Sequence, residues 1–176
     1  MGIAKPFMPH KLFCGLLFSD IGVVEDLLGV LKPRFGDAEL RSGSFSFNDT
    51  DYYREEMGAD ILREYIVFSK LIDPGALAEI KLFTNKVEAD FADKALGARR
   101  VNIDPGLISP AKIMLATTKD YAHRVPLARG IYCEVTLSFK EKSFGPLAWT
   151  YPDYKRQLTI DFFNKARNIY MEQLKA

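Results

Sequence analysis

Hydrophobic and polar positions follow one another along the chain in patterns that predict a series of strands and helices. Residues 11–18 (KLFCGLLF) are nearly all apolar, which is typical of a central strand covered on both faces. Ser19 or Asp20 then caps a helix, and Pro33 and Gly36 end it. Its inward face, at helical spacing, consists of Val23, Val24, Leu27, Leu28 and Leu31.

The middle of the chain holds two predicted strands and a long predicted helix. Alternation at residues 44–47 and the apolar run within residues 62–72 predict the strands. Asp73 followed by Pro74 marks the helix start, because an acidic N-cap and a proline at the first helical position are both favoured there. We expect this helix to reach about residue 96.

The next stretch allows two interpretations. Residues 100–103 alternate and predict a strand, and Asp104-Pro105-Gly106 predicts a turn directly after it. Ser109-Pro110 repeats the cap-and-proline signal, which favours a short helix over residues 110–118. A strand through residues 113–117 is the alternative.

A hairpin and a closing helix complete the pattern. Residues 125–128 and 131–139 flank the turn Arg129-Gly130, and residues 144–154 form an aromatic, proline-rich segment without a regular pattern. The last helix begins at Thr159. The second hairpin strand places on one face Ile131, Cys133, Val135, Leu137 and Phe139.

The order of these elements predicts the fold class. The first six spell βαββαβ, the ferredoxin-like arrangement. We therefore expect a single α+β domain over residues 1–176, with a ferredoxin-like core extended by a C-terminal β-hairpin and a closing helix.

Composition changes this picture little. The 176 residues are 48% apolar and 27% charged, as in ordinary globular proteins. Neither a signal peptide nor an apolar run of membrane-spanning length is evident, so we expect a cytoplasmic protein without a membrane partner. Cys14 and Cys133 lie in apolar runs, which indicates free buried thiols in a reducing compartment.

Charge is distributed unevenly. Before Arg99 the chain has 11 Lys and Arg against 16 Asp and Glu, and from Arg99 onward it has 13 against 7. A basic half favours an anionic ligand, although a solvated surface with scattered lysines would give the same count.

The candidate chemistry gathers in this basic half. Lys119 and Arg124 supply positive charge for an anion, and His123 adds an imidazole, the side-chain type whose unperturbed pKa is near neutral. With a two-residue hairpin loop, Val125 would pair with Glu134 and put His123 within reach of that carboxylate, a pairing used in acid–base catalysis; a charge pair on a solvated hairpin is the alternative. The same polar cluster contains Thr117, Thr118 and Asp120.

A second candidate group ends the strand before the predicted turn. Asn102 and Asp104 share one strand face, and Arg100 offers a further cation for a ligand. Asp104 would alternatively do no more than hold its own turn. We assign His123, Glu134 and Asp104 as the candidate catalytic residues.

Several established motifs are absent. The chain has no phosphate-binding loop, dinucleotide fingerprint, nucleophile elbow or Cys-x-x-Cys pair. Two histidines exclude a histidine-rich metal site, whereas carboxylate-bound Mg²⁺ stays open and no cofactor is indicated. Nucleic-acid binding is disfavoured, because basic and aromatic residues do not interleave.

Seven separated motifs nevertheless carry a resemblance to a known family: TDYYREEMG, LIDP, IKLFTN, RRVNIDPG, ATTKDYAHR, GIYCEVTL and WTYPDY. With these motifs the chain resembles the bacterial family called domain of unknown function 4416. The resemblance implies no established activity. Some members are labelled GTP-binding protein, but Thr117-Thr118-Lys119-Asp120 lacks the Asn-Lys-x-Asp spacing that reads guanine.

Two function classes therefore compete. The first is a protein that binds or acts on a small anionic, phosphorylated or nucleotide-like ligand through the residues above. The second is a non-catalytic interaction or assembly module, with homo-oligomers included, that uses residues 144–154 and the helix face at Thr84 and Asn85.

Overall fold

A computed structural model describes residues 2–49, 53–58, 60–93 and 98–175 of the chain. The fold is α+β and is built on one antiparallel sheet of nine strands. The strands are β1 (His10–Phe18), β2 (Ala38–Arg41), β3 (Phe45–Ser46), β4 (Leu62–Ile72), β5 (Val101–Ile108), β6 (Lys112–Thr117), β7 (Val125–Ala128), β8 (Ile131–Lys140) and β9 (Ser143–Pro146). The helices are α1 (Gly22–Phe35), α2 (Arg54–Met57), the 3₁₀ turn η1 (Pro74–Ala76), α3 (Leu77–Phe91), α4 (Pro152–Lys155) and α5 (Gln157–Gln173).

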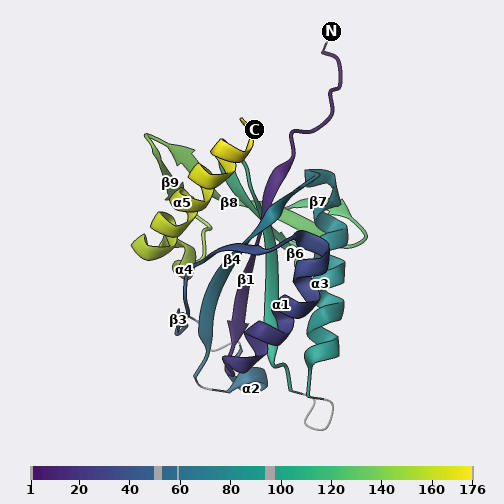
Figure 1. Ribbon diagram of the computed structural model, residues 1–176, viewed down its shortest axis with the longest axis vertical. Helices are drawn as coiled ribbons and strands as arrows, with labels where there is room; N and C mark the ends of the chain where they lie inside the picture. The colour runs from purple at the N-terminus through teal and green to yellow at the C-terminus, as the bar shows by residue number, and fades with distance from the viewer. Residues whose placement is uncertain (1, 50–52, 59, 94–97, 176) are drawn as a thin grey trace.

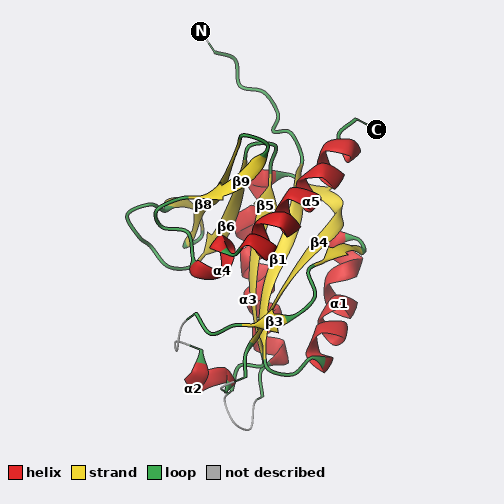
Figure 2. Ribbon diagram, turned by 90° about the vertical axis from the view of Figure 1, so that its left-hand side faces the viewer, coloured by secondary structure: helices red, strands yellow, loops and turns green. Residues whose placement is uncertain are grey.

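Strand β1 lies inside the sheet, as its apolar run predicts. The strand order is β2-β4-β1-β5-β6-β8-β7, with β3 also paired to β4 and β9 to β8. All of β1 except its first residue is buried, because β4 and β5 flank it and helices cover both faces. Figure 1 shows α1 and α3 side by side, and Figure 2 shows α5 in front of the sheet with α3 behind it.

Each face of the sheet has its own core. The core under α1 and α3 is aliphatic and includes Leu16, Leu27 and Ile103. The core under α5 is aromatic: the Phe13 and Phe163 ring centroids lie 4.9 Å apart in an edge-to-face arrangement. Full burial of such a side chain contributes roughly 1.5–3 kcal/mol to stability. The buried phenylalanines of α5 therefore hold this helix against the second face of the sheet.

The predicted turn at Asp104-Pro105-Gly106 is wrong, because β5 continues through it to Ile108. Gly106 serves close packing instead, since a Cβ there would overlap the ring of Phe13 on the neighbouring strand. Pro105 has no N–H to donate, and the β5–β6 ladder begins only after it, at Gly106.

The predicted helix over residues 110–118 is also wrong, and the alternative strand forms as β6. The Ser109 hydroxyl oxygen accepts from the backbone N–H groups of Ala111 and Lys112, at 3.3 and 3.1 Å. Ser109 therefore caps the tight turn between β5 and β6, a role that uses the same residue types as a helix start.

The hairpin strand β8 does not keep its apolar residues on one face. Ile113 pairs with Leu137 and the next residue, Met114, pairs with Val135, so Thr136 is the extra residue of a β-bulge. Cys133 consequently belongs to the aliphatic core and Leu137 to the aromatic one. The prediction of a single apolar face was wrong because a one-residue shift reverses the faces.

Three further differences concern element boundaries. Helix α3 ends at Phe91, where Ala92 is extended, instead of near residue 96; residues 94–97 lie outside the described part. The segment expected to be irregular contains β9 and α4, and the last helix starts at Gln157. Among the described residues, no helix combines the length and apolar character needed to cross a membrane.

Both cysteines are free and buried, as the sequence predicts. Burial raises the pKa of the Cys14 thiol to about 12 and that of Cys133 to about 11. The raised pKa keeps both thiols protonated, and the thiolate is the reactive form. Both side chains therefore serve as small apolar groups in the packing.

Candidate functional site

A cavity of about 840 Å³ opens where β5 and β6 separate. The two strands are paired only from Gly106 to Ile108, opposite Ile113–Leu115. Asn102 and Asp104 precede this ladder on β5, Ala116 and Thr117 follow it on β6, and all four line the cavity. The other walls come from helix α3, the start of β4, strand β8 and the chain around α2 and α4.

A buried ion pair lies at the wall formed by β4 and α4. Arg63 Nη2 is 2.6 Å from Asp153 Oδ2, and the Tyr65 hydroxyl donates to the same oxygen at 2.9 Å. Burial, the largest single effect, would lower the pKa of the Arg63 guanidinium, but Asp153 and the other acidic groups around it together outweigh burial and hold that pKa above its ordinary value. Arg63 is therefore charged, and Asp153 orients it.

Helix α3 contributes a second charged group at the cavity. Lys81 Nζ donates to the Ile103 carbonyl at 2.8 Å and lies 3.5 Å from Asp104 Oδ1. Glu88 Oε1 accepts from the Ile103 N–H at 2.8 Å and lies 3.8 Å from Lys81 Nζ. Asn102 Nδ2 donates to Asp104 Oδ2 at 2.8 Å. Lys81 and Glu88 thus tie α3 to the backbone of β5, and Lys81 also lies close to the Asp104 carboxylate.

Burial raises the pKa of Glu88 above its ordinary value, in spite of Lys81. The fold therefore favours the protonated carboxyl more than the unfolded chain does. The stability that this gives is present below the unfolded pKa of about 4.3 and is lost as pH rises through the folded pKa. We expect Glu88→Gln to leave the free energy of unfolding unchanged at pH 4 and to raise it by up to about 1 kcal/mol at pH 7. Urea denaturation at both pH values measures this.

Glu79→Gln is the matched control, because Glu79 is exposed on the same helix. Its effect is expected to stay within about 0.5 kcal/mol at both pH values. A Glu88→Gln variant that is less stable than the native protein at pH 7 would contradict the prediction, since it would show that attraction to Lys81 exceeds the cost of burial.

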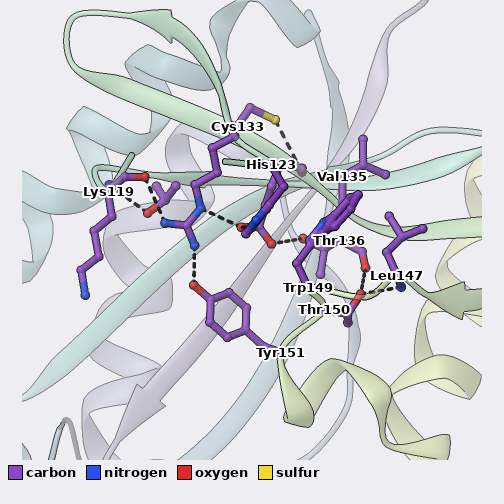
Figure 3. A network of polar contacts seen from close by, with 12 residues as sticks. Lys119, His123, Cys133, Val135, Thr136, Leu147, Trp149, Thr150 and Tyr151 are labelled. Carbon is purple, nitrogen blue, oxygen red and sulfur yellow. Dashed lines mark hydrogen bonds and ion pairs between the residues drawn. The ribbon is translucent and has the colours of Figure 1, made fainter. Parts of the chain in front are cut away.

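The third group centres on Glu134 of β8, which is only 2% exposed. Glu134 Oε2 accepts from Arg124 Nε at 2.9 Å and lies 3.2 Å from His123 Nε2, while Oε1 accepts from the Thr136 hydroxyl at 3.2 Å. Arg124 Nη2 donates to the Tyr151 hydroxyl at 2.6 Å, and Figure 3 shows the Tyr151 ring below this network, with Lys119 to its left and Thr136 to its right. Arg124 thereby links β8 to the segment before α4.

The predicted approach of His123 to Glu134 is confirmed, but the register behind it was wrong. Ala128 pairs with Ile131 as expected, whereas a shift between Pro126 and Ala128 pairs Val125 with Cys133. His123 precedes β7 and reaches Glu134 from the loop. The solvated-pair alternative does not hold, since Glu134 is buried.

The His123 ring is stacked on Trp149, with centroids 5.0 Å apart and planes 12° from parallel. The Trp149 indole N–H donates to the Val135 carbonyl at 2.8 Å, which fixes the ring (Figure 3). His123 does not line the cavity, but its hydrogen-bond partner Glu134 does.

The cavity brings together most of the sequence-predicted residues. Arg100 lies elsewhere and pairs with Asp20 at 3.0 Å, and Asp120 is exposed and outside the lining. Thr84 is buried and donates to the Lys81 carbonyl at 3.0 Å, so it offers no contact surface, whereas its neighbour Asn85 faces the cavity. The predicted residues in the lining are Asn102, Asp104, Thr117, Thr118, Lys119, Arg124 and Glu134.

The lining also contains residues that sequence reasoning did not assign to a ligand site, among them Arg63, Lys81, Glu88, Asp153 and Tyr154. A usable signal existed for two of them. Arg63 lies in a strand that is otherwise mostly apolar, and Lys81 falls next to the apolar stripe of its helix, so both are charged residues at core positions. Asp153 and Tyr154 follow Pro152 in an aromatic stretch and carry no such signal.

The cavity is not basic overall. Its described lining holds five basic residues, Arg63, Lys81, Arg99, Lys119 and Arg124. It also holds six acidic residues, Asp49, Glu56, Glu88, Asp104, Glu134 and Asp153. No group of three or more His, Cys, Asp or Glu among the described residues has the geometry to hold a metal ion.

Comparisons with known proteins agree with the resemblance carried by the motifs. The chain belongs to the family described as "Domain of unknown function (DUF4416)", whose model matches residues 8–170. No curated protein and no solved structure matches the chain.

Proposed function

We propose that this member of the DUF4416 family binds a small ligand with an anionic group in the cavity between β5 and β6. The observation that carries the proposal is Arg63, a charged, buried residue of the lining. Its Nη1 and Nε atoms have no hydrogen-bond partner among the described residues, and the nearest carboxylate oxygen to Nη1 that forms an ion pair with it, Asp104 Oδ2, is 3.7 Å away. A buried donor left unpaired costs about 1–3 kcal/mol, and an anionic acceptor would satisfy it.

Other lining residues support the same proposal. Asn85, Asn102 and the Thr117 and Thr118 hydroxyls supply neutral polar groups around the cavity, and Lys119 supplies a cation at its edge. A cavity of about 840 Å³ has the size of a small-molecule site. The finer expectation, a phosphorylated or nucleotide-like ligand, remains to be decided by a ligand screen.

A catalytic role would use His123, Glu134 and Asp104. Glu134 faces both the cavity and His123, so a proton on the imidazole would reach the cavity through this carboxylate. Arg124 Nε donates to the same carboxylate oxygen. If the protein binds its ligand without catalysis, the bond between Arg124 and Glu134 holds this wall of the cavity in place.

A thermal-shift screen of nucleotides, sugar phosphates, small carboxylates and divalent ions tests the proposal. A ligand at 100 times its Kd stabilises the native state by about 2.7 kcal/mol, so a binder raises Tm by several degrees. Lys119→Ala should reduce that rise, and Lys165→Ala, which changes an exposed lysine on α5 outside the cavity, should not. No rise with any compound would contradict the proposal.

Exposed rings favour the interaction module as a second candidate. Tyr121 and Trp149 flank His123 and, with Tyr151, are among the large side chains exposed on the surface. Aromatic residues are enriched at protein interfaces. Size-exclusion chromatography with light scattering should then show an oligomer that Trp149→Ala dissociates, and a strict monomer would count against this function.

For the fold, the proposal retains a ferredoxin-like core formed by β1, α1, β2 with β3, β4, α3 and β5. It is supported by the order β2-β4-β1-β5 and by the packing of both helices against one face. Strands β6 to β9 would then be an extension of that core beyond β5.

A further inference from the structure

Helix α3 lies along the part of β5 that does not pair with β6. Lys81 Nζ donates to the Ile103 carbonyl at 2.8 Å, and the Ile103 N–H donates to Glu88 Oε1 at 2.8 Å. Asn85 lies between Lys81 and Glu88 on the helix, about one turn from each, so the three share one helix face and all line the cavity. Asn85 is therefore held beside the open edge of β5, close to Ile103 and its neighbour Asp104.

Two polar groups in this region have unused capacity for hydrogen bonds. Asp104 Oδ2 accepts from Asn102 Nδ2 at 2.8 Å, whereas Oδ1 lies 3.5 Å from Lys81 Nζ and accepts no hydrogen bond among the described residues. The half-buried Asn85 side chain makes no hydrogen bond within the described part of the chain. Its amide offers two N–H donors and one acceptor oxygen. This wall of the cavity therefore presents an acceptor and a donor that a ligand can use.

The surroundings of Asp104 select the kind of ligand group that lies beside it. Asp104 Oδ1 requires a hydrogen-bond donor, and a fully ionised carboxylate or phosphate offers acceptors only. The anionic group of the ligand therefore lies elsewhere in the cavity. An ammonium group would donate, but Lys81 at 3.5 Å from Oδ1 and Arg63 at 3.7 Å from Oδ2 repel a further positive charge. The group beside Asp104 is therefore a neutral donor.

A hydroxyl group suits Asp104 and Asn85 at the same time. It is both a donor and an acceptor, so a single hydroxyl oxygen can donate to Asp104 Oδ1 and accept from the Asn85 amide. Water satisfies accessible polar groups of this kind in a free protein, and a hydroxyl reproduces the hydrogen bonds of that water. A methylene group does not, and a ligand that places only carbon here loses affinity.

The end of β6 adds further neutral groups to the lining. The Thr117 hydroxyl oxygen accepts from the Lys119 N–H at 3.2 Å, and the Thr117 O–H itself makes no hydrogen bond among the described residues. Thr118 follows with a second hydroxyl that lines the cavity. The charges of the described lining nearly cancel, with six acidic residues against five basic ones, so neutral contacts supply an important part of the affinity. A ligand with several hydroxyl groups satisfies more of these contacts than a ligand with one.

We infer that the ligand of this cavity carries several hydroxyl groups in addition to its anionic group, and that one hydroxyl bridges Asp104 Oδ1 and the Asn85 amide. The inference rests on the proposed function, which requires only that a ligand with an anionic group enters the cavity. Sugar phosphates and sugar acids share this chemistry, because both join several hydroxyls to one anionic group. Asn85 is then a residue that determines specificity.

Isothermal titration calorimetry on the full chain tests the inference with probe pairs of matched size, in which one member has hydroxyl groups and the other has none. The pairs are glucose 6-phosphate with cyclohexylmethyl phosphate, and gluconate with hexanoate. The first pair carries a phosphate and the second a carboxylate, so the two sources of the anionic group are separated. The hydroxylated member of at least one pair should bind more tightly than its partner by about tenfold or more.

Asn85→Ala tests the position of the bridging hydroxyl. It should weaken binding of the hydroxylated probe by about tenfold, and any binding of the partner probe should not change. The unliganded Tm should not fall, because the Asn85 side chain makes no hydrogen bond among the described residues and alanine favours a helix. Asn168→Ala is the matched control, since Asn168 is exposed on α5 outside the cavity, and it should keep the native affinity for every probe.

Three outcomes separate the inference from the proposed function. If the hydroxylated probes bind no more tightly than their partners, the inference is overturned and ligand binding stands. If the preference for hydroxyls is unchanged in Asn85→Ala, the bridge between Asp104 and Asn85 is overturned and ligand binding again stands. If no probe of either pair binds, both fail.

Discussion

Asp153→Ala is expected to lower the free energy of unfolding by about 3–5 kcal/mol, because it leaves the buried Arg63 guanidinium without its closest counter-charge. The distance from Arg63 Nη2 to Asp153 Oδ2 is 2.6 Å, and both side chains are almost fully buried. The Tyr65 hydroxyl loses its acceptor in the same variant. Asp104, at 3.7 Å from Arg63 Nη1, remains as a more distant counter-charge. Urea denaturation at pH 7 measures the loss.

An exposed ion pair provides the matched control. Glu172 pairs with Lys175 at 2.7 Å, but their side chains are 73% and 67% exposed. Glu172→Ala should therefore cost less than about 1 kcal/mol. Equal losses for the two variants would show that Arg63 does not depend on Asp153, and the proposed orientation of Arg63 toward the ligand would fail with it.

Gly106→Ala is expected to destabilise the protein by about 3 kcal/mol, at the upper end of overpacking changes in a core. The added Cβ would overlap the Phe13 ring and lie 2.5 Å from the Met114 carbonyl oxygen. The backbone atom cannot move away without breaking the β5–β6 ladder, where Gly106 pairs with Leu115. Thermal and urea denaturation should both report the loss.

Gly145→Ala separates this steric effect from the general effect of replacing a strand glycine. Gly145 lies in β9, and a Cβ there meets nothing within 4 Å. The variant should stay within about 0.5 kcal/mol of the native protein. Phe13→Leu combined with Gly106→Ala should recover part of the loss, and the absence of any recovery would argue that the Phe13 ring is not the obstacle.

These two predictions concern the same region from two sides. Gly106 allows β5 to pair with β6 up to Leu115, and the cavity begins where that pairing stops. Asp153 and Arg63 then close the cavity from α4 and β4. Loss of either contact should therefore also weaken binding of any ligand found in the screen.

The elements that local pattern predicted well are those with long, uninterrupted periodicity. Helix α1 buries the five predicted positions, and β4 spans the predicted residues 62–72. Each pattern repeats several times within one element, so neighbouring residues alone specify it. The four-residue β2 was not predicted, since it offers only two alternations.

The errors fell where short signals carry two meanings. Asp104-Pro105-Gly106 has the composition of a turn, and Ser109-Pro110 that of a helix start, yet the first lies inside β5 and the second closes a turn. Pairing with β1 and packing of Phe13 against Gly106 outweigh the local preference. Such contacts join segments about ninety positions apart and leave no mark on the local pattern.

The candidate site divides in the same way. The polar cluster before β7 and its approach to Glu134 could be predicted, because a hairpin turn is a local signal that brings its two strands together. The family could also be recognised from the sequence, because each of its motifs is a short run of neighbouring residues. The partners of Arg63 and Lys81 could not be predicted. Tyr65 and Asp153 are 88 positions apart, and only the packing of α4 against the sheet brings that carboxylate to the buried arginine beside the cavity.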